Sequence, residues 1–140
     1  VHEEGGMWLD HGGPEGIRGY PGMTRQEIAD RFPHVVLPQE VGHDGWWRAG
    51  REEWDAFLAR AERVAAELRK QCASTERVAI VTHGGFGAYL IRALARVSVD
   101  APTFFHHDNT GITRVRFRPD GRVSIRYQNR VDHLPPDLVT

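Results

Sequence analysis

The sequence predicts an α/β fold in which helices cover a mostly parallel central sheet in three layers, α/β/α. Three observations carry this prediction. An amphipathic pattern with helical period runs from about residue 52 to 71, an apolar run at 78–82 leads into a glycine-flanked histidine, and alternation over 111–128 is typical of a β-hairpin. Such a mixture of periods indicates a layered domain with the 78–82 strand in the middle of its sheet.

The composition is that of a globular domain and excludes several function classes. The 140 residues are 40% hydrophobic and 26% charged, and the formal net charge of −1 argues against a nucleic-acid partner. No apolar run approaches the roughly 20 residues of a membrane span, and no secretory signal opens the sequence. The single Cys72 cannot form an internal disulfide, which favours a cytoplasmic location.

The first third of the chain predicts mostly irregular structure. Residues 1–23 are rich in glycine and contain two prolines, so we expect a long loop there. Thr24 and Glu27 match a capping box, which predicts a short helix that ends before Pro33. Residues 34–50 carry further turn-forming residues and predict a second irregular stretch.

The middle of the chain holds the first candidate site residue. The helix at 52–71 has apolar residues at helical spacing and charged residues on its other faces. The 78–82 run predicts a buried strand that ends at His83, and residues 84–94 predict a helix that starts at once. Ligands of open α/β sheets bind where strands end, and helix N-termini favour anions. His83 meets both conditions, and the alternative is a packed histidine at a strand end.

The C-terminal part predicts two strands at 111–118 and 122–128, joined by a tight Pro-Asp-Gly turn. One face of this hairpin is apolar, and the alternating side chains of its other face are arginines: Arg114, Arg116, Arg118 and Arg126. We interpret the arginine face as a solvated surface, with partner binding as the alternative.

The sequence gives little support for a metal site or for a catalytic serine. The eight histidines are His2, His11, His34, His43, His83, His106, His107 and His133. No helix carries two of them at metal-ligand spacing, and the adjacent pair would point apart in an extended segment. No lysine-bearing phosphate loop and no nucleophile-elbow serine occur. We therefore expect no metal and no cofactor. A metal hydrolase is the alternative, and a chelator would abolish its activity.

A candidate acid lies near the start, where Glu3 and Glu4 precede a pair of glycines. Burial beside a pocket would raise the pKa of such a carboxyl and make it a proton donor near neutral pH. Spacing alone leaves two interpretations, a solvated acidic pair and a general acid, and favours the first.

Several segments together resemble the histidine phosphatase superfamily, also called phosphoglycerate mutase-like. Val-Thr-His-Gly-Gly at 81–85 resembles its second-histidine motif, and Asn-Thr-Gly-Ile-Thr at 109–113 resembles the start of its next strand. Residues 120–134 resemble its C-terminal hairpin and His-Leu ending, and 19–24 is similar to the insert over its pocket. The resemblance implies that residues 1–140 form one domain, the C-terminal two-thirds of the family's fold.

The resemblance implies a phosphomonoester hydrolase or a phosphoglycerate-type mutase that acts on a phosphorylated small molecule through a phosphohistidine, without a cofactor. His83 would donate a hydrogen bond to the phosphoryl oxygens, and the Gly84 N–H would add to the same anion site. Glu3 falls where the family has its general acid, with Glu4 as the alternative.

The sequence departs from the family because it contains no Arg-His-Gly, the motif of the nucleophilic histidine. The strand that carries this motif would lie before Val1, so the predicted sheet is incomplete and has an open apolar edge. We expect a fragment of a longer phosphatase, with little activity alone. The alternative is a shortened homologue, either a non-catalytic phosphate-binding or interaction module or a chain completed by another copy in a homo-oligomer.

Overall fold

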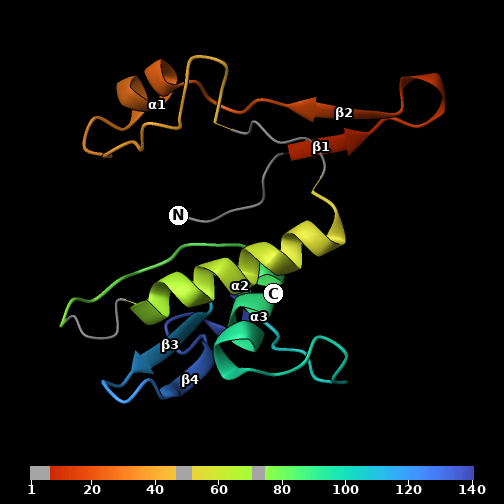
Figure 1. The fold of residues 1–140 in the computed structure, drawn as a ribbon. Coiled ribbons are helices and arrows are strands. Elements are labelled where there is room, and N and C mark those ends of the chain that lie inside the picture. The colour runs from red at the N-terminus through yellow and green to blue at the C-terminus, as the bar shows by residue number, and fades with distance from the viewer. Residues whose placement is uncertain (1–6, 47–51, 71–74) are drawn as a thin grey trace. The chain divides into compact units, whose positions relative to one another are not determined.

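The computed structural model describes residues 7–46, 52–70 and 75–140 and shows a mixture of helices and strands (Figure 1). The described residues divide into two compact units, one up to residue 54 and one from residue 55 onward. The elements are β1 (Met7–Asp10), β2 (Ile17–Tyr20), α1 (Arg25–Arg31), α2 (Trp54–Lys70), α3 (Gly84–Ala95), β3 (Ile112–Phe117) and β4 (Val123–Arg130). None of the helices described is long and apolar enough to cross a membrane.

The N-terminal unit contains a hairpin that the sequence did not predict. β1 pairs antiparallel with β2, so the prediction of a loop over residues 1–23 was wrong for these two strands. Gly12, Gly13 and Gly16 between them have φ values of +69°, +53° and +56°, a backbone region that glycine enters without steric cost. The glycines that suggested an irregular loop therefore form a reversal between two short strands.

Helix α1 begins at the predicted capping box, which the structure confirms. The Glu27 N–H donates to Thr24 Oγ1 at 3.2 Å, and the Thr24 N–H donates to Glu27 Oε2 at 2.7 Å. The Thr24 N–H and the Thr24 hydroxyl, which donates to Glu27 Oε2 at 2.9 Å, stabilise the charged carboxylate and lower the pKa of Glu27.

The core of the C-terminal unit lies between α2, α3 and the inner face of the β3–β4 hairpin (Figure 1). Phe86 in the first turn of α3 is fully buried, and Phe57 of α2 meets it edge to face with the ring centroids 5.9 Å apart. The buried residues of this core are Ala61, Val64, Ala65, Phe86, Leu90, Ile91, Ala93 and Leu94. The helices and the hairpin thus agree with the prediction, and the packing places the start of α3 against the hairpin.

The predicted strand at 78–82 is not formed. The described residues between 75 and 83 lie in no strand, and the strands β1 to β4 form two antiparallel pairs. Ile80 packs against the core, whereas Val78 and Val81 are 58% and 80% exposed. A parallel strand needs neighbours on its edges, and no described segment pairs with this one. The mixed α/β character is confirmed, but the three-layer parallel sheet is not.

Candidate functional site

His83 occupies the position before the first turn of α3. Its backbone is extended, with φ −78° and ψ 154°, and its carbonyl accepts the first helical hydrogen bond from the Gly87 N–H at 2.9 Å. The His83 side chain is exposed and does not cap the helix. The N–H groups of the first turn have no partner within a helix, and they form the positive end of its dipole. His83 therefore directly precedes the backbone donors at the start of α3.

Two glycines at this helix start have different surroundings. A Cβ atom on Gly84 would lie 3.2 Å from the His107 carbonyl oxygen, so this position is closed by the loop before β3. A Cβ atom on Gly85 would meet no atom within 4 Å. Gly84 therefore lets the loop approach, whereas space beside Gly85 is open to a ligand.

His107 is fixed between the helix start and the hairpin. Its Nδ1–H donates to the Phe105 carbonyl at 2.9 Å, so in a neutral ring Nε2 accepts from the Thr113 hydroxyl at 3.1 Å. Thr113 Oγ1 in turn accepts the Asn129 N–H at 3.1 Å. The ring also lies close to Gly87, where a Cβ atom would be 3.7 Å from His107 Cε1. One chain of hydrogen bonds thus connects β3 and β4 to His107, and the His107 ring lies against the first turn of α3.

Asn129 holds the loop that carries His107. Its φ of +51° is unusual for a residue with a side chain, and the side chain makes two bonds to Asp108: Oδ1 accepts the Asp108 N–H at 2.8 Å, and Nδ2–H donates to Oδ2 at 2.6 Å. His106 donates to the other carboxylate oxygen at 2.7 Å. Hydrogen bonds from His106 and then Asn129 lower the pKa of Asp108, and this favours its charged form.

The predicted site residues have different outcomes. His83 and Gly84 lie together at the start of α3, whereas Glu3 and Glu4 lie outside the described residues. His106 and His107 bind different partners, as expected for side chains that point apart. Over residues 7–46, 52–70 and 75–140, no group of three or more histidine, cysteine, aspartate or glutamate side chains is placed to hold a metal.

Sequence reasoning missed His107, Thr113 and Asn129 as the support of this site. The available signal was that Thr113, the second residue of β3, belongs to the segment 109–113 that the family resemblance had singled out. Nothing in the order of residues pairs His107 with Gly84, which lies more than twenty positions earlier, so this contact had to come from the fold.

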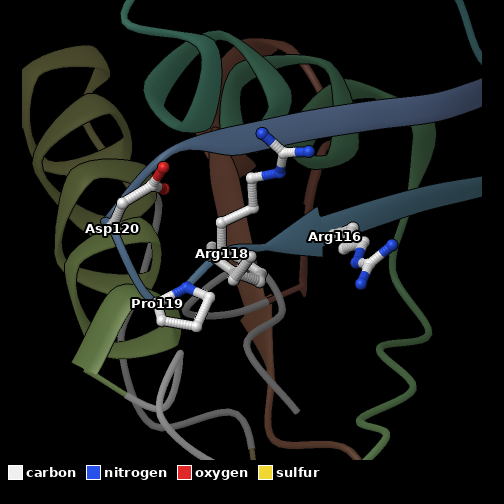
Figure 2. A pocket seen from close by; sticks show the side chains of 5 residues that line it. Arg116, Arg118, Pro119 and Asp120 are labelled. Atoms are coloured by element: carbon white, nitrogen blue, oxygen red, sulfur yellow. The ribbon is translucent and has the colours of Figure 1, made fainter.

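Two hollows lie in the C-terminal unit away from the start of α3. One, of about 360 Å³, lies at the β3–β4 turn and is lined by Arg116, Phe117, Arg118, Pro119 and Asp120 (Figure 2). The other, of about 400 Å³, follows the groove between α2 and the last turn of α3. His83 lines neither of them.

Comparison with protein families decides the assignment. The sequence model of the histidine phosphatase superfamily, branch 1, matches residues 17–130, a stretch that begins with β2 and ends with β4. The chain belongs to the histidine phosphatase superfamily. The match includes His83 and the hydrogen bonds that Thr113 makes with His107 and Asn129, and it begins after Glu3. Searches of curated proteins and of solved structures returned no match.

Proposed function

We propose that this chain belongs to an enzyme that transfers phosphoryl groups through a phosphohistidine, as a phosphomonoester hydrolase or a phosphoglycerate-type mutase. Membership of the superfamily supports this reaction class. The observation that carries the proposal for this chain is the place of His83, which directly precedes the first backbone N–H groups of a 12-residue helix, with an open space next to Gly85.

In this proposal His83 is the partner of the nucleophile and not the nucleophile itself. The attacked phosphoryl group spreads its charge over its equatorial oxygens, and preorganised donors at those oxygens lower the barrier. The His83 imidazole and the Gly84 N–H supply two such donors. Glu3 would protonate the leaving oxygen and later activate water.

The nucleophilic histidine has to come from outside these 140 residues, because they contain no Arg-His-Gly. A strand that carries this motif beside residues 78–82 would also give that segment a neighbour and complete the predicted three-layer sheet. The exposure of Val81, 80%, supports this part of the proposal, since a buried strand position would suit its side chain.

The direct test measures phosphate binding and turnover separately. Titration of the chain with orthovanadate, followed by NMR of the histidine rings, should shift the His83 signals, and His83→Ala should weaken binding at least tenfold. His34→Ala, at an exposed histidine of the N-terminal unit, is the matched control. Equal binding by all three proteins would refute the role of His83.

Turnover is then tested by joining the chain to a family segment that contains Arg-His-Gly. The joined protein should hydrolyse p-nitrophenyl phosphate in the presence of a chelator and form an acid-labile phosphoenzyme, whereas the 140 residues alone should not. Robust activity of the chain alone would show that the nucleophile is present after all. Loss of activity to the chelator would favour a metal hydrolase.

A second candidate is a non-catalytic phosphate-binding or interaction module, and the absence of Arg-His-Gly from these residues favours it. It predicts the same vanadate-induced shift at His83 but no turnover by the joined protein. The two experiments together therefore separate the enzyme from the module. A phosphorylated small molecule as ligand and a cytoplasmic location are parts of the proposal that both candidates share.

A further inference from the structure

The β3–β4 hairpin has one face that packs and one that does not. Val115, Phe117, Val123 and Ile125 point inward and pack against the core. Between them, exposed arginines alternate along β3, and further exposed arginines lie at the turn and on β4: Arg114, Arg116, Arg118, Arg122, Arg126 and Arg130. This arginine-rich outer surface is called the arginine face below.

Acidic neighbours neutralise only part of the arginine face. Arg122 lies 3.7 Å from the Asp120 carboxylate, and Arg130 pairs with Asp132 at 2.6 Å. Within the described ranges, the remaining guanidinium groups have neither an ion pair nor a hydrogen bond, and these are Arg114, Arg116, Arg118 and Arg126. Like charges that gather on one face repel one another, so an anionic partner would relieve this repulsion.

The backbone sets a regular spacing between these charges. Arg114, Arg116 and Arg118 occupy every second position of an extended chain, which separates successive guanidinium stems by about 6.5 Å. Arg126 is the extra residue of a bulge, because Val115 pairs with Ile125 while Arg114 pairs with Tyr127. The bulge adds a fourth exposed arginine to the face. An extended peptide with acidic side chains at alternate positions has the same period.

A hollow at the hairpin turn adjoins the arginine face. The hollow at the hairpin turn is lined by Phe117 and Pro119 as well as by Arg116, Arg118 and Asp120. Figure 2 shows the side chains of Arg116 on β3 and of Arg118 just after it, while the Asp120 carboxylate lies at the turn. An apolar side chain flanked by carboxylates would therefore find both kinds of contact here.

We propose that the arginine face is a docking surface for an acidic, extended segment of a partner protein, with an apolar side chain seated in the hollow at the turn. Nucleic acid fits less well, because the chain has a net charge of −1 and an isoelectric point near 6.8. The surface is independent of phosphoryl transfer at His83.

The test uses the whole chain and a short fluorescent peptide that alternates glutamate with threonine and contains one leucine. Fluorescence anisotropy should show saturable binding, weakened severalfold when NaCl rises from about 50 to about 300 mM. Arg114→Glu/Arg116→Glu should weaken binding at least tenfold. Arg63→Glu/Arg77→Glu, which reverses two exposed arginines elsewhere in the same unit, should change it less than twofold.

Further variants separate the loss of positive charge from added repulsion and from misfolding. Arg114→Gln/Arg116→Gln removes charge without adding repulsion, and we expect its helical circular dichroism to match the parent and its binding to weaken at least fivefold. A peptide with serine in place of leucine tests the hollow and should bind at least threefold more weakly. No peptide binding, equal loss in the control variant, or tighter binding of a single-stranded oligonucleotide would each overturn the proposal.

Discussion

The two ends of helix α3 differ in how their backbone groups are satisfied. At the C-terminal end, the carbonyls of Arg92, Ala93 and Leu94 accept hydrogen bonds from the Val97 N–H, the Arg96 N–H and the Arg69 guanidinium. At the N-terminal end, the first helical donor is the Gly87 N–H, and small residues precede it. Every helix leaves such groups at both ends. Here the C-terminal end is closed by protein, whereas the N-terminal end is open beside Gly85.

The side chain of Arg92 completes the closed end. It is 4% exposed, and its guanidinium donates to the carbonyls of Ser98, Ala101 and Thr103. A buried cation among carbonyls fixes the loop that follows the helix, so this end has a structural role. The difference between the ends predicts that changes at the C-terminal end lower stability more than changes at the N-terminal end.

The largest effect is expected at Arg92. Arg92→Met keeps the apolar stem but leaves three carbonyls without their donor, and we expect the free energy of unfolding to fall by about 3 kcal/mol. Urea denaturation measures this loss. Arg96→Met, at an exposed position in the same turn, should change stability by less than about 0.5 kcal/mol. Equal losses of stability in both variants would show that the buried Arg92 side chain contributes no more than an exposed arginine.

A smaller effect is expected at Asn129, which supports the open end through Asp108. Asn129→Ala removes two hydrogen bonds and places alanine at φ +51°, so unfolding should become easier by about 2 kcal/mol. In Asn129→Gly, glycine adopts this φ without strain but also lacks the side chain that bonds Asp108. Thermal unfolding of the two variants separates backbone strain from hydrogen bonding, and a loss in alanine alone would exclude a role for the Asp108 bonds.

The neighbouring glycines give a matched pair at the open end. Gly84→Ala brings a Cβ to 3.2 Å from the His107 carbonyl and should destabilise the chain by about 1 kcal/mol. Gly85→Ala meets open space and should stabilise α3 by a few tenths of a kcal/mol, because alanine favours helices. Calorimetry of both variants measures the difference. The opposite order would contradict the close approach of His107.

The smallest effect concerns pH. Because its hydrogen bonds lower the pKa of Asp108 in the folded chain, they add stability at pH values above the ordinary carboxyl pKa of about 4. That stability is lost as the pH falls through the lower folded pKa. The urea midpoint should therefore drop less between pH 6 and pH 3 in Asp108→Asn than in the parent chain. An identical pH dependence would exclude this contribution.

The sequence predicted those elements whose determinants are local. The capping box of α1, the apolar stripe of α2 and the alternation in β3 each depend on residues a few positions apart. The β1–β2 hairpin escaped prediction because its glycines are equally compatible with an irregular loop, and only the pairing between the strands distinguishes the two. The expected strand at 78–82 is apolar enough, but a strand also requires a partner on its edge.

The candidate site also combines features encoded by adjacent residues with features that depend on tertiary contacts. From the sequence by itself came His83 and Gly84 at a helix start, because a turn and the helix that follows it are encoded by adjacent residues. Only the tertiary structure decided that His107 closes one side of this helix start, that Asn129 holds the loop in place, and that the space beside Gly85 stays open. Contacts between residues more than twenty positions apart depend on how α3 packs against the hairpin, and periodicity carries no information about that packing.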